Sequence, residues 1–529
     1  MRWDFPYPSR RMPVIADRVV ATSQPLAAAA GLAVLDAGGT AVDAAICAAI
    51  TLTVVEPTSN GIGGDAFAIV WDGALHGLNA SGCAPAGQPR SAFAGAERMP
   101  RTGWGSVTVP GAVSAWIELH ARFGALPFGR LFEPAVRHAE RGYPVSPMTA
   151  AAWARSVERF RKFPEWMKAF APHGRAPAPG ERVRLPDHAR TLRAIAESGG
   201  DAFYRGELAQ RIEDAARADG AAMRADDLRG HRAEWVSPWS IEYRDAELHE
   251  LPPNGQGVAA LIALGLLRHH RIDHLDPDGA ECIHLQVECM RAAFADAHRY
   301  VGDPANGRAD ASRLLDPQGL AARAARINPA RAQPWEARPI PGAGTVYVAA
   351  ADHAGRAASF IQSNYEGFGS GIVIPGTGIA MQNRGAGFSL EPGHANEYAP
   401  SARPFHTIIP GFLTRGGRAL AAFGVMGGPM QAQGHVQFTV RTVDFGMNPQ
   451  AAIDAPRWQV MDDGTLALEP GFPESTVAGL AQRGHAVRVD AAGTHFFGGA
   501  QCAWRTEADD AGAWIAASDP RRDGQAAGT

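Results

Sequence analysis

The hydrophobic pattern of this 529-residue chain changes its period partway along, and this change constrains the fold more than any other feature. Between about Val109 and Arg299 the apolar residues recur every 3.6 positions or so, as in helices. One strand-like pair, "WSIEYRDAELHEL" from Trp239, interrupts them. After Gly344 the apolar residues follow strand alternation instead, in "TVYVAAAD", "AASFIQS", "FHTIIPGFL" and "ALAAFGVMGG". The pattern predicts a helix-rich first part and a strand-rich second part.

Two alanine-rich helices are expected near the N-terminus. Ser23 is a suitable N-cap, and Pro25 suits the first turn of a helix that ends at Gly38-Gly39. A second helix is expected from about Ala41 to Val55. Both are too apolar for surface helices, so we expect them to pack against a sheet. The glycine loop that follows joins a helix to a strand, the reverse of the order in phosphate-binding loops, which argues against nucleotide binding.

Composition and charge argue against several classes of partner. The net charge of -4 gives no electrostatic reason for nucleic acid or an anionic membrane to bind. No run reaches the ~18 to 20 apolar residues of a membrane span, and the first residues lack the apolar core of a signal peptide. The five cysteines show no CxxC spacing, so a disulfide framework is not expected. We therefore expect a cytoplasmic protein with no nucleic-acid or membrane partner.

The sequence gives little evidence for a metal site or for the motif of a serine hydrolase. His284 and Glu288 lie one turn apart on a predicted helix, and "HHRIDHLDPD" from His269 gathers further candidate ligands. Neither has HExxH spacing, so we interpret them as a polar helix face and a solvated turn, with no metal site and no cofactor. The G-x-S-x-G motif of serine hydrolases is also absent from the sequence.

A different chemistry is available at Thr345, where a loop rich in proline and glycine passes into a strand. Most threonines at such a point are structural, because β-branched residues favour strands. A threonine hydroxyl becomes a useful nucleophile only when a base lies within hydrogen-bonding reach. A freed α-amino group, with a pKa of about 7.7 to 8.0, can supply that base on the same residue.

Long motifs flank this threonine on both sides. Upstream lie "GLAVLDAGGTAVDAAICAAITLTVVEP", "GIGGDAF", "EPAVRHAERGYPV" and "AFADAHRYVGDP". Downstream lie "GFGSGIVIPGTGIAMQNRGAGFSL", "RPFHTIIPGFL", "AFGVMGGPMQAQGHVQ" and "VDFGMNPQAAIDAPRW". In this order, from about Val19 to about Trp458, the chain resembles the γ-glutamyltranspeptidase (glutathione hydrolase) family. The resemblance implies an α+β protein with the four-layer αββα fold of N-terminal nucleophile hydrolases, made as a proenzyme that cuts itself before a threonine.

The resemblance also implies where the chain is cut. The family's nucleophile falls on Thr345, so the scissile bond is Gly344-Thr345. Residues 1–344 would form a large subunit and residues 345–529 a small one, together making one αββα domain. The two subunits would remain associated as a heterodimer, and two heterodimers could pair further.

Further catalytic groups follow from the same match. "VMGGPM" matches the family's oxyanion glycines at Gly427 and Gly428, and backbone N–H groups are the usual donors to such an oxyanion. Ser363 lies where the family has a second hydroxyl that bonds the nucleophile. No metal ion and no organic cofactor is implied.

The family's contacts to substrate are changed in this chain. Ser81 replaces the arginine that binds the α-carboxylate of the γ-glutamyl group, and Gly387 replaces the aspartate that binds its α-amino group. A buried charge without a partner costs several kcal/mol, so glutathione should bind poorly. The other substrate-contact positions hold new residues, namely Arg384, His406, Thr407, Tyr365 and the adjacent Asn364.

Two interpretations of the new residues remain open. Arg384 and His406 could form an anion site for a substrate with one small carboxylate, such as oxamate. Alternatively, Arg384 pairs with a structural carboxylate and His406 packs in the core. Divergent family members, oxamate amidohydrolase and the cephalosporin acylases, take substrates other than glutathione.

We expect an autoprocessing threonine amidohydrolase that acts on a small-molecule amide through an acyl-enzyme. One alternative is a true glutathione hydrolase or γ-glutamyltransferase whose clamp uses other residues. Another is a binding protein on the same fold that has lost processing, since Val346 and Tyr347 replace the threonine and histidine that usually follow the nucleophile.

Overall fold

Both alanine-rich helices are present and deeply buried. The computed structural model describes residues 10–307, 311–335, 344–490, 497–506 and 512–529. Helix α1 spans Pro25–Asp36, and α2 spans Ala41–Val55 with every residue buried. Ser23 was wrongly predicted as the cap of α1. The side chain of Gln24 accepts the hydrogen bond from the α1 backbone, because the Ser23 hydroxyl donates instead to the buried carboxylate of Glu56 at 2.5 Å.

Helices α1 and α2 lie against an antiparallel seven-stranded sheet with the order β19-β2-β10-β11-β3-β4-β7. Its strands are β2 (Val19–Thr22), β3 (Asp65–Trp71), β4 (Leu75–Asn79), β7 (Glu234–Val236), β10 (Val346–Ala351), β11 (Ala357–Ser363) and β19 (Gln525–Gly528). The strands β10 and β11 that follow Gly344 therefore lie in the middle of the sheet, between β2 and β3. Strands from both sides of this glycine build one sheet.

The second sheet is also antiparallel and seven-stranded, with the order β1-β18-β17-β13-β12-β9-β8. Its strands are β1 (Val14–Ala16), β8 (Trp239–Tyr243), β9 (Ala246–Glu250), β12 (Gly411–Arg415), β13 (Arg418–Met426), β17 (Gly499–Arg505) and β18 (Trp514–Ser518). Helices α11 (Gly257–Leu267) and α14 (Met430–Val443) pack against it, and α12 (Ala280–Tyr300) packs on α11.

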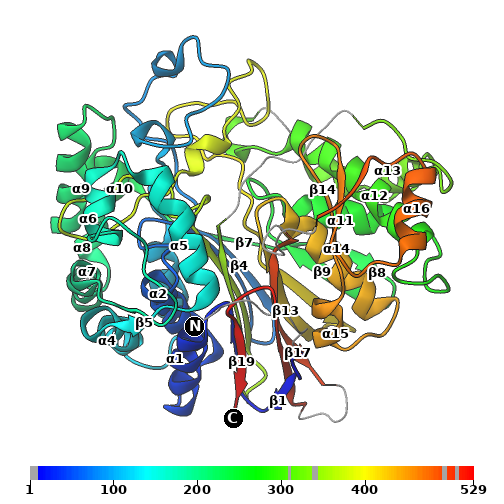
Figure 1. The fold of residues 1–529 in the computed structure, drawn as a ribbon, viewed down its shortest axis with the longest axis horizontal. Coiled ribbons are helices and arrows are strands. Elements are labelled where there is room, and N and C mark those ends of the chain that lie inside the picture. Colours follow the sequence, from blue (N-terminus) through cyan, green and yellow to red (C-terminus); the bar gives the residue numbers. More distant parts are fainter. Residues whose placement is uncertain (1–9, 308–310, 336–343, 491–496, 507–511) are drawn as a thin grey trace.

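The two sheets pack face to face and complete a four-layer αββα arrangement (Figure 1). Their shared core includes Phe67 and Tyr347 from the first sheet and Phe412 and Trp514 from the second. The predicted fold is confirmed. Among the described residues, no helix combines the length and the apolar character that a membrane span needs.

The remaining elements lie outside the two sheets (Figure 1). The helices on the side of the first sheet are α3 (Ala112–Phe123), α4 (Glu133–Arg141), α5 (Pro147–Phe160), α6 (Pro164–Phe170), α7 (Pro186–Glu197), α8 (Asp201–Tyr204), α9 (Glu207–Ala218) and α10 (Ala225–Gly230). Those on the side of the second are α13 (Pro317–Ala324), α15 (Pro449–Asp454) and α16 (Glu474–Gln482). Two small sheets hold β5 (Tyr143–Pro144), β6 (Arg182–Val183), β14 (Trp458–Val460), β15 (Leu466–Leu468) and β16 (Val487–Val489).

Candidate active site

Thr345 lies at the start of a central strand, opposite a second hydroxyl. Strands β10 and β11 pair with Val346 opposite Gln362, which brings Thr345 beside Ser363. The Thr345 hydroxyl donates to Ser363 Oγ over 3.3 Å, and both side chains are buried. The neighbouring hydroxyl predicted from the sequence is therefore in contact with the predicted nucleophile.

Ser363 also contacts the peptide bond that precedes Thr345. Its hydroxyl donates to the carbonyl oxygen of Gly344 over 2.6 Å, and its oxygen accepts from the backbone N–H of Tyr365 over 2.8 Å. Gly344 has φ +129°, and a Cβ there would lie 2.3 Å from the backbone nitrogen of Gly367. Because no side chain fits, only glycine can hold this carbonyl against Ser363.

The two predicted oxyanion glycines form the turn between β13 and α14. Gly427 has φ +129° and Gly428 has φ +62°, conformations that favour glycine. Gly427 lines the same cavity as Gly344 and Thr345. Within the described part of the chain, neither glycine N–H is bonded to an acceptor. The turn therefore offers unused backbone donors beside the threonine.

This cavity has a volume of about 520 Å³ and is rich in arginine. Its charged lining residues are Arg101, Arg155, Arg159, Arg522, Glu366 and Asp462. Glu366 accepts from both Arg101 and Arg159, with distances of 2.5 and 2.8 Å for the closest contacts. With four arginines against two carboxylates, the cavity carries a net positive charge. None of these residues was predicted from the sequence, because they come from α5 and from distant loops and share no local pattern with the strand that follows Thr345.

Arg155 is the arginine of this group with the fewest contacts. It is exposed on α5, and among the described residues it forms no ion pair or hydrogen bond. A guanidinium placed in this way is available to a carboxylate on a bound molecule.

Arg384 is fully buried and does not line this cavity. Its guanidinium lies 4.1 Å from the ring centre of Tyr365, donates to Thr407 Oγ1 over 2.8 Å, and reaches Ser363 Oγ at 3.5 Å. No carboxylate in the described residues lies within ion-pair distance of it. Burial lowers the pKa of Arg384 to about 10, so it stays charged at neutral pH. Arg384 therefore contacts Ser363 but lies outside the cavity that Thr345 lines.

His406 matches the structural alternative more closely. It is fully buried, and its Nε2 lies 3.0 Å from Asp65 Oδ2. Burial, with a contribution from Arg384, lowers the pKa of His406 well below its usual value, so the ring is neutral. Burial also raises the pKa of Asp65 to about 7, although Arg384 opposes that shift. His406 is not among the residues lining the Thr345 cavity.

Asn364 and Tyr365 directly follow Ser363 in the chain. Tyr365 has φ +76°, an uncommon conformation for a bulky residue and one that occurs at functional sites. It lines a neighbouring cavity of about 570 Å³ together with Gly387. Asn364 is fully buried, and its side-chain amide has no hydrogen-bond partner in the described residues.

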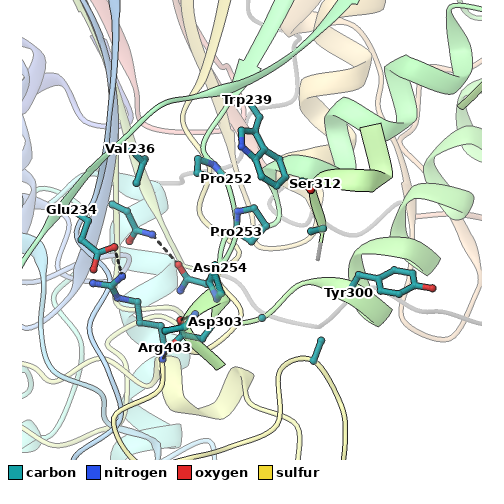
Figure 2. Close-up of a pocket in the computed structure, with 16 residues that line it drawn as sticks. Glu234, Val236, Trp239, Pro252, Pro253, Asn254, Tyr300, Asp303, Ser312 and Arg403 are labelled. Carbon is teal, nitrogen blue, oxygen red and sulfur yellow. Dashed lines mark hydrogen bonds and ion pairs between the residues drawn. The ribbon is translucent and has the colours of Figure 1, made fainter. Parts of the chain in front are cut away.

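Ser81, which replaces the family's arginine, belongs to a separate amide cluster. Its hydroxyl donates to Asn79 Oδ1 over 2.7 Å, and Asn79 in turn donates to Asn254 over 2.9 Å. Figure 2 shows Asn254 beside the ion pair of Arg403 with Glu234, at the edge of a cavity of about 390 Å³. The Arg403 guanidinium also donates to the Ser81 carbonyl oxygen over 3.1 Å, so this nearby cation is already engaged by Glu234 and by the backbone.

The chain is similar to known proteins over nearly its whole length. The model of the gamma-glutamyltranspeptidase family matches residues 27–529. The chain is 35% identical to the "Glutathione hydrolase-like YwrD proenzyme" of Bacillus subtilis, over 97% of this chain and 98% of that one. It is 37% identical to the "Oxamate amidohydrolase proenzyme" of Klebsiella pneumoniae, over 95% and 97%. The crystal structure of cephalosporin acylase from Bacillus halodurans superposes with a TM-score of 0.95 at 48% identity, covering 100% of this chain and 99% of that one.

Proposed function

Since this chain belongs to the γ-glutamyltranspeptidase family and is therefore an amide-hydrolysing proenzyme, we propose that Thr345 is its nucleophile and that it cuts itself between Gly344 and Thr345. One observation carries the proposal. In the uncut chain the Ser363 hydroxyl bridges the Thr345 hydroxyl and the Gly344 carbonyl oxygen, at 3.3 and 2.6 Å.

This bridge supplies both proton movements of the attack step in self-cleavage. As Thr345 Oγ1 bonds to the Gly344 carbonyl carbon, its proton passes to Ser363 Oγ, and the Ser363 proton passes to the carbonyl oxygen. The tetrahedral intermediate then breaks its C–N bond while the proton on its new C–OH group passes to the departing nitrogen, and the C=O bond re-forms as the carbonyl of an ester. The resulting ester joins Gly344 to the Thr345 side chain, and water hydrolyses it. The products are residues 1–344 and a fragment that begins at Thr345.

The same residue then acts on the substrate. The freed α-amino group of Thr345 accepts the hydroxyl proton during attack on the amide and returns it to the leaving amine. The N–H groups of Gly427 and Gly428 stabilise the oxyanion, for which they have no competing acceptor among the described residues. Water resolves the acyl-enzyme, and no step uses a cofactor.

We propose that the substrate is a small amide with a free carboxylate. The arginine-rich cavity beside Thr345 supports an anionic substrate, and the loss of both clamp residues at Ser81 and Gly387 argues against a γ-glutamyl group. A true glutathione hydrolase with an altered clamp remains the second candidate. Fold similarity alone does not choose between them.

A denaturing gel with Thr345→Ala and Thr345→Ser variants tests the cleavage. Wild type should give fragments of residues 1–344 and 345–529, Thr345→Ser should give the same fragments more slowly, and Thr345→Ala should give one band. A single wild-type band would support the binding-protein alternative. The processed protein should then be assayed with oxamate, a glutaryl amide and γ-glutamyl-p-nitroanilide. Preference for the last compound would support the second candidate.

The assembly follows from the fold. In the first sheet, β10 and β11 of the second fragment lie between β2 and β3 of the first, so we propose that the fragments stay together as a heterodimer after cleavage. A further pairing of heterodimers and a cytoplasmic location also remain proposals, which gel filtration and cell fractionation would test.

A further inference from the structure

A second cluster of reactive side chains lies among residues that do not line the Thr345 cavity. His284 and Glu288 are one turn apart on α12, and His485 lies just after α16, which packs on α12. All three side chains are buried, and their potential ligand atoms lie within 4.8 Å of one another. Sequence spacing revealed the first two residues but not the third.

His284 is oriented by a backbone carbonyl. Its Nε2 donates to the carbonyl oxygen of Asn328 over 2.8 Å, which leaves Nδ1 without a proton and directed at His485 Nε2, 2.7 Å away. Metal-ligating histidines are typically held in this way, with the second ring nitrogen bonded to a carbonyl or carboxylate.

Glu288 is held in a similar manner. Its Oε2 accepts from the backbone N–H of Gln333 and from the Trp335 indole N–H, both at 3.0 Å. Its Oε1 is buried and has no hydrogen-bond partner among the described residues. Leaving a buried carboxylate oxygen unpaired is costly, so the arrangement calls for another positive or donor group.

We propose that His284, Glu288 and His485 bind one divalent transition-metal ion of the zinc class. Two imidazoles and one carboxylate are a donor set that zinc accepts, with Zn–N distances of about 2.0 to 2.1 Å. A tetrahedral ion at those distances sets the two nitrogens about 3.3 Å apart. Binding therefore separates the two rings by roughly 0.6 Å and moves the His485 proton to Nδ1. A water molecule completes the shell.

Two arginines reduce the affinity of this site. Arg291 and Arg483 both interact electrostatically with the cluster. Their side chains donate to the carbonyl oxygens of Gly464 and Gly479 rather than to the three ligands. We therefore expect weaker binding than at a four-ligand structural zinc site, with a requirement for all three side chains.

The position of the site suggests a structural use. His284, Glu288 and the residues that orient them precede Gly344, whereas His485 follows it. A metal ion here would join the two proposed fragments, although the binding itself does not depend on cleavage.

The test uses full-length protein without a histidine tag, stripped with a chelator and titrated with zinc. We expect about one zinc per chain by elemental analysis after gel filtration, and a rise in Tm on adding zinc. Glu288→Gln and His485→Gln should each reduce bound zinc at least tenfold. His353→Gln, at an exposed histidine elsewhere, is the matched control and should bind zinc as wild type does.

Cobalt(II) provides a readout that needs no variant. A site with nitrogen and oxygen ligands should give the visible absorption of tetrahedral cobalt without the thiolate band that the nearby Cys282 would add. The proposal is overturned if stripped wild type binds less than a tenth of an equivalent of zinc, if the thiolate band dominates, or if folded Glu288→Gln and His485→Gln bind zinc as tightly as wild type.

Discussion

At the residue scale, the proposed self-cleavage depends on the Ser363 hydroxyl. It accepts from the Thr345 hydroxyl and donates to the Gly344 carbonyl oxygen, so it would serve as both base and acid in the uncut chain. In the proposed mechanism the α-amino group of Thr345 takes over the first of these roles after cleavage. The two proposed reactions therefore differ in their dependence on Ser363.

We predict that Ser363→Ala slows self-cleavage by about 10²- to 10⁴-fold, the usual contribution of a positioned acid or base. The fraction of cut chain can be followed on a gel over time after synthesis. Ser363→Thr keeps the hydroxyl and should cleave far faster than the alanine variant. Equal rates for Ser363→Ala and wild type would contradict the proton relay.

Substitution of Arg384 distinguishes a role in positioning Ser363 from a role in binding the substrate's carboxylate. Because its guanidinium contacts Ser363 and lies outside the Thr345 cavity, Arg384→Gln should slow self-cleavage and lower kcat. The KM for an anionic amide should change less than twofold. A large rise in KM with unchanged cleavage would instead support the anion site that the sequence suggested for Arg384 and His406.

At the element scale, α5 contributes the positive charges of Arg155 and Arg159 to the candidate site. The proposed catalytic groups lie at the start of β10, at the end of β11 and in the turn after β13. We predict that Arg155→Ala raises the KM for an anionic amide about two- to fivefold, as expected for an exposed ion pair. Steady-state kinetics should show kcat and self-cleavage unchanged, and added salt should reduce the difference. Arg161→Ala, beyond the end of α5 and paired with Glu158, is the control and should leave KM unaltered.

The sequence predicted some elements well and others poorly, for physical reasons. Helix α2 and strands β10 and β11 were placed correctly, because their apolar patterns are strong and uninterrupted. The expected strand at "FHTIIPGFL" begins only at Gly411, since residues before it turn toward Asn254 and Gln256. Helices α14 to α16 were missed because the alternation of neighbouring strands dominated the pattern.

The parts of the candidate site that lie within short sequence motifs were predictable. The parts that depend on contacts between distant segments were not. Thr345, Ser363 and the glycine turn lie in motifs that can be recognised in the sequence. The burial of Arg384 behind Tyr365 and the pairing of His406 with Asp65 depend on contacts between distant segments. The position of Arg155 and Arg159 of α5 beside the Thr345 cavity depends on such contacts as well.

At the scale of the whole molecule, the first sheet takes strands from both of the proposed fragments. This arrangement would let the chain be cut between Gly344 and Thr345 and remain folded. It also buries several carboxyl groups, which makes stability depend on pH.

Glu56 is the clearest of these carboxyl groups. Burial raises its pKa to about 7, against a usual value near 4.5. As pH rises from 4.5 to 7 the unfolded chain loses this proton while the folded protein keeps it, so Glu56 makes the free energy of unfolding fall by up to about 3 kcal/mol. Denaturant unfolding at pH 5 and 7.5 should show a smaller fall for Glu56→Gln than for wild type. Equal pH dependence in the two proteins would contradict this assignment.

The most direct test of the whole account is the N-terminal sequence and intact mass of the small fragment in active, purified protein. Self-cleavage between Gly344 and Thr345 predicts a small fragment that begins with a free amino group on Thr345. A protein that hydrolyses its amide substrate while the bond between Gly344 and Thr345 is intact, or that is cut at another position, would contradict it.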